Sequence, residues 1–261
     1  MAQPSPILDV DLPAFESGDA ATRAAVVDGT MRSLVTGFVY VRHDLSEDLL
    51  DDAYGRLAAF FSLPQDRKDR CTVPGSNGQT GYTGLLVETA AVSEVPDFKE
   101  MLNWSAPVPA GHPLRLRYPH RYGDPTLPDE DLPGTTEVLM EFHHTILDLQ
   151  RRVLRILAVG LGVDEGYFDV MLRDGAALTR ALHYPSMDLA PGDEHVWAAE
   201  HGDINLITAL PRATAPGLQV RTNDAWIDAD RKSVVEGKSV DLGGRRIIRK
   251  QNKMPPVASR R

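Results

Sequence analysis

The segment His201-Gly202-Asp203-Ile204-Asn205-Leu206-Ile207-Thr208 is the part of the sequence from which fold and chemistry can be inferred together. In an extended strand, residues i and i+2 point to the same face, about 6–7 Å apart along the chain. The His201 imidazole and the Asp203 carboxylate can then occupy two adjacent positions on one metal ion. They would form two thirds of the facial triad of two histidines and one carboxylate, which leaves three metal positions open.

The His-x-Asp pattern is weak evidence when it stands alone. Eight histidines in an Asp-rich chain make a chance match common. The alternative interpretation is a turn-stabilising aspartate beside a surface histidine. The sequence on either side of the triplet is therefore needed to choose between a metal site and a turn.

Around the triplet, apolar residues recur with the spacing of short strands. Residues 178–184 alternate with a period of two before Pro185 ends the run, and residues 205–210, 217–220 and 225–227 are short apolar runs between turn residues. Helices and a few strands precede them in the chain. This order predicts an α+β protein whose core is mostly β and ends in an antiparallel sandwich or jelly roll.

The N-terminal part carries the helical signals. Residues 20–35 form a helical stretch before Gly37. Ser46 is a plausible N-cap for a second helix, which Pro64 closes and on which Leu49, Ala53, Leu57 and Phe61 repeat every four residues along one face. Strands are expected at 6–10 and 38–41, and 105–134 reads as a long surface excursion that borders a functional site.

The clearest helix follows this excursion. It is predicted from a stripe of apolar residues at three- and four-residue spacing: Phe142, Ile146, Leu149, Val153 and Ile156. His143 and His144 lie on the same helix, and adjacent helical positions point about 100° apart. They are therefore expected to be ordinary surface or boundary histidines.

Further segments match one protein family in the right order. They are Pro6-Ile7-Leu8-Asp9, Gly37-Phe38-Val39-Tyr40-Val41, Phe60-Phe61-Ser62-Leu63-Pro64, Gly81-Tyr82, Asp97-Phe98-Lys99-Glu100, Gly217-Leu218-Gln219-Val220 and Trp226-Ile227-Asp228. From about residue 6 to residue 228, the chain resembles the isopenicillin-N-synthase-like Fe(II), 2-oxoglutarate-dependent oxygenases.

The resemblance implies a double-stranded β-helix, or jelly roll, that holds Fe(II), with 2-oxoglutarate as cosubstrate and dioxygen as oxidant. His201 and Asp203 match the first two metal ligands. Tyr184, in His183-Tyr184-Pro185, matches a family tyrosine near the cosubstrate, although a core tyrosine with a satisfied hydroxyl is an equal alternative. His183 is expected to point to the other face, and His195 to be a loop residue.

The family pattern breaks after the Trp-Ile hairpin. The family's third ligand is a later histidine, but His201 is the last histidine of this chain. An Arg-x-Ser pattern that binds the distal carboxylate of 2-oxoglutarate is also missing at the expected place. Arg231-Lys232-Ser233 comes too early to serve. We therefore expect a jelly roll that is incomplete at its C-terminus.

The charge reverses at the same point. Ten of the 28 Lys and Arg residues follow Asp230 but only two of the 37 Asp and Glu residues do, so residues 1–230 carry a balance of −17. The string that begins Asp230-Arg231-Lys232-Ser233-Val234-Val235-Glu236-Gly237 resembles a translated sequencing adapter; a natural basic tail is the alternative. The expected regions are therefore 1–135 (N-terminal family region), 136–229 (start of the jelly-roll core) and 230–261 (non-native tail).

Composition limits the partners. An acidic body is a poor nucleic-acid binder, and no run reaches the ~18–20 apolar residues of a membrane span. A lone cysteine, Cys71, excludes an internal disulfide, and without an export signal at the start a reducing cytoplasm is expected. No oligomer signal stands out, so a monomer that acts on a small molecule is expected.

Three functions are compatible with the sequence. The first is an oxygenase that hydroxylates, desaturates or cyclises a small molecule, or belongs to the ethylene/succinate-forming type. The second is a non-catalytic binding protein on the same scaffold. The third, a zinc hydrolase, lacks a nearby third ligand and a general base. Because a ligand and strands are missing, we expect the chain as written to be inactive and unstable.

Overall fold

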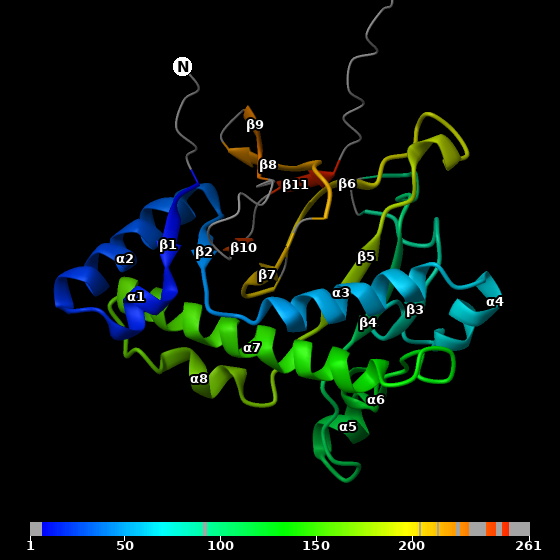
Figure 1. The fold of residues 1–261 in the computed structure, drawn as a ribbon, viewed down its shortest axis with the longest axis horizontal. Coiled ribbons are helices and arrows are strands. Elements are labelled where there is room, and N and C mark those ends of the chain that lie inside the picture. Colours follow the sequence, from blue (N-terminus) through cyan, green and yellow to red (C-terminus); the bar gives the residue numbers. More distant parts are fainter. Residues whose placement is uncertain are drawn as a thin grey trace, which may run out of the picture.

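The computed structural model describes residues 7–90, 93–203, 205–212, 214–222, 225–229, 239–243 and 247–250 (Figure 1). A layer of helices lies along one side, and short strands lie above it in the view of Figure 1. Within the described residues no helix is long and apolar enough to cross a membrane.

The helices are concentrated before residue 173. They are α1 (Leu12–Ser17), α2 (Ala20–Ser33), α3 (Glu47–Phe61), α4 (Gln65–Lys68), α5 (Pro113–Arg117), α6 (Pro119–Tyr122), α7 (Thr135–Gly160) and α8 (Tyr167–Leu172), with 3-10 turns at Leu34–Thr36, Asp69–Cys71 and Met187–Leu189. The long helices α3 and α7 run side by side under the strands (Figure 1).

Among the described residues the strands form three sheets, in which all strand pairs except β1 with β2 are antiparallel. They are β1 (Asp9–Asp11), β2 (Tyr40–Arg42), β3 (Gly81–Thr83), β4 (Glu100–Trp104), β5 (Thr179–His183), β6 (Ala198–Gly202), β7 (Thr208–Leu210), β8 (Leu218–Thr222), β9 (Ala225–Asp228), β10 (Ser239–Gly243) and β11 (Ile247–Lys250). Their orders are β1-β2-β10-β7, β6-β11-β8-β9 and β3-β4-β5.

Local sequence signals explain where the helices begin. The Ser46 side chain accepts a hydrogen bond from the Leu49 amide, which is the N-cap expected for α3. Asp11 and Asp19 cap α1 and α2 in the same way. Gly37 ends the first helical region in the left-handed conformation, with φ of 86°. Gly81 also has a positive φ, and a side chain there would collide with the Cys71 carbonyl, so only glycine permits this start of β3.

The main core lies between the helices and the helix-facing sides of the sheets. All five residues of the predicted α7 stripe are buried in it. Residues of β4 join them there, and Trp104 is wholly buried and donates a hydrogen bond from Nε1 to the Leu139 carbonyl at 3.1 Å. A smaller cluster at Ile7, Phe38 and Val220 connects the first strands with β8.

Three local expectations need correction. His143 is buried rather than at the surface, because α7 places it under β5, where its Nδ1 lies 2.7 Å from the Thr179 hydroxyl. The stretch 105–134 contains the short helices α5 and α6, each beginning with a proline at a position where no backbone N–H is needed. In α3 the buried positions are Leu50, Ala53 and Phe60, one residue away from part of the expected stripe.

Two stretches of the predicted non-native tail have strand backbone. β10 pairs with β2 and β7, and β11 pairs with β6 and β8. Pairing through backbone groups requires extended geometry rather than a particular sequence. The remaining residues of 230–261 lie outside the described residues, and the origin of this segment stays a prediction.

Candidate active site

His201 and Asp203 lie at the end of β6. The His201 Nε2 atom is 3.9 Å from Asp203 Oδ1, and the two side chains are 41% and 18% exposed. Asp203 follows directly after the last residue of the strand, so the pair shares one side of a strand end rather than the middle of a strand. The expected juxtaposition is present, and an ion could be reached from solvent.

Hydrogen bonds orient both side chains. His201 Nδ1 lies 2.8 Å from the Ala199 carbonyl oxygen, and a carbonyl only accepts, so Nδ1 carries the proton. The lone pair of the neutral ring is then on Nε2, which faces Asp203. On the carboxylate, Oδ2 accepts a hydrogen bond from the Thr208 hydroxyl, which leaves Oδ1 toward the histidine. Such outer hydrogen bonds are what fixes metal ligands in proteins.

The donor set fits two positions of an iron ion. Two ligands at right angles on one ion are about 3 Å apart at bond lengths of about 2.1 Å, so a small side-chain movement from 3.9 Å would suffice. Among the described residues no three His, Cys, Asp or Glu side chains come together as a metal cluster. The described part of the chain thus brings together two candidate ligands and no third.

Tyr184 lies directly after β5 and close to β6. Its ring centroid is 6.0 Å from that of Trp197, and Trp197 Nε1 donates a hydrogen bond to the Pro185 carbonyl at 2.7 Å. Burial, then the charges of Asp97 and Glu88, raise the pKa of the Tyr184 phenol. The phenol is therefore a neutral hydrogen-bond donor at physiological pH.

Next to Tyr184 and β6 is a network of buried and partly buried charges, of which the sequence indicated only Asp97 and Lys99, as part of a family marker. Lys99 Nζ lies 2.7 Å from Asp97 Oδ2 and 2.6 Å from Glu88 Oε2. Arg180 binds the other Glu88 oxygen at 3.1 Å and donates to Asn103 Oδ1 at 3.0 Å. Burial alone would raise the pKa of Glu88, but Lys99 and Arg180 hold it below its ordinary value.

A second buried charge cluster surrounds Glu100. Its carboxylate lies 2.7 Å from Lys68 Nζ, 2.5 Å from the Tyr82 hydroxyl and 2.7 Å from His183 Nδ1. Burial favours a raised pKa, yet the hydrogen bonds from His183, Lys68 and Tyr82 lower the pKa of Glu100. His183 thus points away from Tyr184, as expected, and stacks on Phe61 with ring centroids 5.1 Å apart.

The remaining histidines join no group of three possible metal ligands among the described residues. His195 lies in a loop, with Nδ1 3.1 Å from the Pro96 carbonyl, as expected. His143 has no described partner for Nε2, and burial followed by the neighbouring His144 lowers the pKa of its ring to about 4. It is a neutral core residue.

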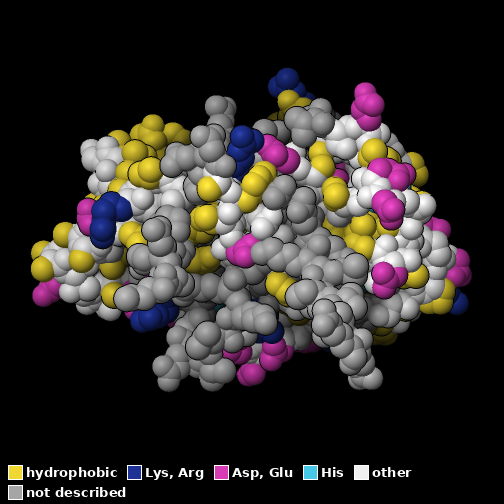
Figure 2. All heavy atoms as spheres, turned by 90° about the horizontal axis from the view of Figure 1, so that it is seen from above, with side chains coloured by type: hydrophobic (Ala, Val, Ile, Leu, Met, Phe, Trp, Pro, Cys, Tyr) yellow, Lys and Arg dark blue, Asp and Glu magenta, His cyan; other side chains and the backbone are white. Residues whose placement is uncertain are grey.

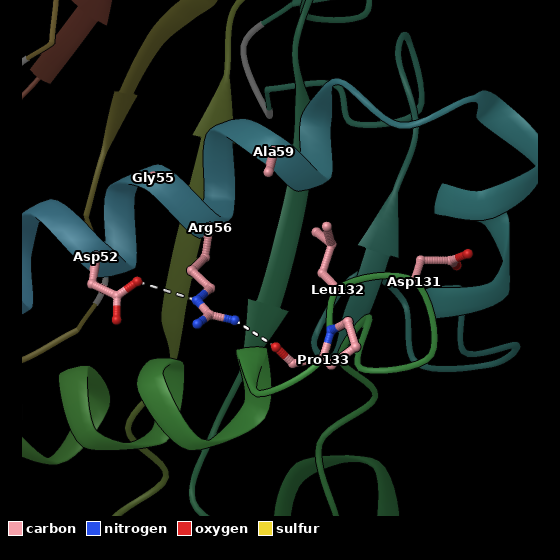
Figure 3. Close-up of a pocket in the computed structure, with 7 residues that line it drawn as sticks. All are labelled: Asp52, Gly55, Arg56, Ala59, Asp131, Leu132 and Pro133. Atoms are coloured by element: carbon pink, nitrogen blue, oxygen red, sulfur yellow. Dashed lines mark hydrogen bonds and ion pairs between the residues drawn. The ribbon is translucent and has the colours of Figure 1, made fainter.

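A surface pocket of about 360 Å³ lies elsewhere, between α3 and residues 131–133 (Figure 3). Arg56 crosses it and binds Asp52 at 3.2 Å and the Pro133 carbonyl at 2.7 Å. The guanidinium is thus already engaged by the protein, and none of the residues that line the pocket belongs to the site at β6.

Figure 2 shows one face of the molecule, on which basic side chains stand among acidic ones over the described part. No broad basic surface of the kind that binds nucleic acid is visible on that part of this face.

Known proteins resemble the chain over most of its length. Residues 6–130 match the family described as the non-haem dioxygenase in morphine synthesis N-terminal region. The 2-oxoglutarate-Fe(II) type oxidoreductase hxnY of Emericella nidulans is 30% identical, with 91% of this chain and 69% of that protein covered. A 2-oxoglutarate-Fe(II) type oxidoreductase of Aspergillus fumigatus is 26% identical, with 87% and 68% covered.

Solved structures share the fold. A 2OG-Fe(II) oxygenase family protein of Caulobacter crescentus superposes with a TM-score of 0.79 at 25% identity, covering 97% of this chain and 82% of that one. A full-length Neurospora crassa protein, solved in complex with alpha-KG, gives 0.78 at 24% identity, with 98% and 82% covered. The expected fold class, helices combined with a jelly-roll core, is thereby confirmed.

Fold, order of motifs and similarity over most of the chain agree. Enzymes of the matching group are oxidoreductases that use Fe(II), 2-oxoglutarate and dioxygen. The chain belongs to the family of 2-oxoglutarate/Fe(II)-dependent dioxygenases.

Proposed function

We propose that this protein binds Fe(II) through His201 Nε2 and an Asp203 carboxylate oxygen and oxidises a small organic molecule. The observation that carries the proposal is the approach of Nε2 to Oδ1, at 3.9 Å, with the opposite ring nitrogen engaged by a carbonyl. With iron and 2-oxoglutarate bound, the family's chemistry couples oxidative decarboxylation of the oxo-acid to oxidation of the substrate. The outcome is hydroxylation, desaturation, cyclisation, or the ethylene/succinate-forming reaction.

Tyr184 serves as a cosubstrate contact in this proposal. Its raised phenol pKa keeps the hydroxyl protonated, so that it can donate a hydrogen bond to a carboxylate of 2-oxoglutarate. Its position against Trp197 supports this role, because Trp197 directly precedes β6, the strand that carries His201. Tyr184→Phe should weaken 2-oxoglutarate binding about tenfold, the loss of one hydrogen bond to a charged group. Unchanged affinity would make Tyr184 a core residue instead.

The proposal includes the segment 230–261. We hold that it replaces the natural sequence that supplies the third histidine and the arginine for 2-oxoglutarate, so the chain as written lacks turnover. Re-sequencing the locus tests this: a clean read giving the same tail contradicts it. Soluble protein that consumes oxygen in the presence of 2-oxoglutarate would also contradict it.

The metal site is tested separately from turnover. Co(II), a spectroscopically visible substitute for Fe(II), should bind the wild-type chain, and His201→Asn and Asp203→Asn should each weaken binding. His195→Asn, a loop histidine, is the matched control and should leave binding unchanged. Equal Co(II) affinity in the wild type and all three variants would show that His201 and Asp203 do not bind the metal.

A non-catalytic small-molecule-binding protein on the same scaffold is the second candidate, favoured by the lack of a third ligand among the described residues. Oxygen uptake by a form with its natural C-terminus, supplied with Fe(II), ascorbate and 2-oxoglutarate, separates the two.

We further propose a cytoplasmic monomer without nucleic-acid partners. A molecular mass in solution of twice the 28.7 kDa chain would contradict the monomer.

A further inference from the structure

The residues just before β4 lie along the strand that carries His201. The Phe98 amide donates to the Val196 carbonyl at 2.8 Å, and the Ala199 amide donates to Asp97 Oδ1 at 2.9 Å. These contacts join positions about a hundred residues apart in the sequence. They fix the start of β6 against the start of β4.

Ala199 connects Asp97 with the histidine. Its amide is held by Asp97, and its carbonyl accepts the hydrogen bond from His201 Nδ1 at 2.8 Å. Restraining the backbone at this residue restrains the direction of the carbonyl. The carbonyl in turn selects the ring tautomer with the proton on Nδ1 and the lone pair on Nε2.

Asp97 is itself firmly placed. Its side chain is 2% exposed, and its second oxygen, Oδ2, binds Lys99 Nζ at 2.7 Å. Lys99 is nearly as buried and is held by Glu88 at 2.6 Å. A buried carboxylate is stable only when its oxygens are partnered, and here one partner is the cation and the other is the amide of β6.

We propose that Asp97 is a positioning residue of the metal site, which acts through Ala199 to hold His201 in the ligating tautomer and orientation. The inference rests on the proposed function only in calling His201 a ligand. The hydrogen bonds from Ala199 to Asp97 and from His201 to Ala199 are present in the structure whatever role His201 has. The proposal thereby gives a functional role to the buried ion pair of Asp97 and Lys99, which has no direct part in the oxygenase chemistry.

The test uses the full chain without metal, labelled with ¹⁵N in its histidine rings, at a pH where the rings are neutral. His201→Asn identifies the His201 signals. In the wild type, His201 should appear with Nδ1 protonated. In Asp97→Ala a substantial Nε2–H population should appear, because the carbonyl is no longer held. A His201 spectrum identical to the wild type in Asp97→Ala overturns the proposal.

Glu100→Gln is the matched control. It removes the charge of an equally buried carboxylate only three residues along the chain, whose partners Lys68, Tyr82 and His183 belong to α4, β3 and β5. It should lower stability, as Asp97→Ala does, yet leave the His201 tautomer unchanged. If Glu100→Gln altered the tautomer as strongly, the effect would be general loosening, and the specific role of Asp97 would be refuted.

If Asp97→Ala does not fold, Asp97→Asn replaces it. The amide oxygen is a weaker acceptor than a carboxylate oxygen. Hydrogen exchange of the Ala199 amide should therefore become faster, with a partial gain of the Nε2–H form. No change in either measurement would overturn the proposal.

A Co(II) titration separates this inference from the proposed function. Outer-shell substitutions weaken metal binding by about tenfold or more, and Asp97→Ala should do so while Glu100→Gln does not. If His201→Asn leaves Co(II) affinity unchanged, the proposed metal site fails. If His201→Asn weakens binding but Asp97→Ala does not, only the role of Asp97 fails.

Discussion

Strands β4 and β6 belong to the same molecule but differ in how the structure surrounds them. Every residue of β4 is buried, and Leu102 and Trp104 on its helix-facing side belong to the core between the strands and α7. In β6 only Ala198 is buried, and His201, one residue before the end of the strand, is 41% exposed. The comparison shows that the two strands are held in different ways. Packing against the helical layer stabilises β4, whereas β6 is positioned largely by polar contacts such as the hydrogen bond from the Ala199 amide to Asp97.

The largest effect on the free energy of unfolding is expected at β4, the strand that packs against the helical layer. Trp104→Ala removes a wholly buried indole and its hydrogen bond to Leu139, and should reduce the free energy of unfolding by about 3–5 kcal/mol. Leu206→Ala, at a side chain that is 52% exposed beside the site, should change it by no more than about 0.5 kcal/mol. Urea unfolding measures both. Equal losses would abolish the distinction between the two regions.

The next effect depends on pH and again belongs to the helical layer. Burial lowers the pKa of His143 to about 4 in the folded protein, below the unfolded value of 6.5. Between these values the unfolded state binds more protons, so stability is present above pH 6.5 and is lost as the pH falls toward 4, by up to about 3 kcal/mol.

Unfolding at pH 7 and pH 4.5 checks this contribution of His143. His143→Gln should flatten the difference between the two pH values. His144→Gln, at the exposed neighbour, should retain most of it. An acid sensitivity as steep in His143→Gln as in the wild type would show that other groups cause it.

A smaller effect on stability but a clear one on binding is expected at the site. Asp203→Asn keeps an acceptor for the Thr208 hydroxyl, so the free energy of unfolding should change by less than about 1 kcal/mol. Co(II) affinity should nevertheless fall about tenfold or more, because the charged ligand is lost. If Asp203→Asn lowered stability as much as Trp104→Ala, Asp203 would be needed for folding rather than for metal binding.

The smallest effect is expected for the ion pair on β6. Glu200 and Arg221 are 3.2 Å apart, and both side chains are more than a third exposed. Glu200→Gln should change the unfolding free energy by less than about 1 kcal/mol, and less still in high salt. By contrast, Lys68→Met, which breaks the buried pair with Glu100, should cost about 3 kcal/mol.

Local signals in the sequence were sufficient to locate the three long helices α2, α3 and α7. The Ser46 cap and the apolar stripe of α7 depend on neighbours within one or two turns, and the structure confirms both. The prediction for His143 was wrong because its burial depends on β5, which follows more than thirty residues later. Spacing along one helix contains no information about which strand will cover it.

The sequence by itself determined the type of chemistry, because the His-x-Asp spacing and the order of motifs around it are local features of the chain. Only the tertiary structure decided how that chemistry is supported. The pairing of Asp97 with Ala199, and of Lys99 with Glu88, joins segments that no local pattern connects. A buried charge is stable only when it is paired, and which partners lie within hydrogen-bond distance depends on how the strands pack together.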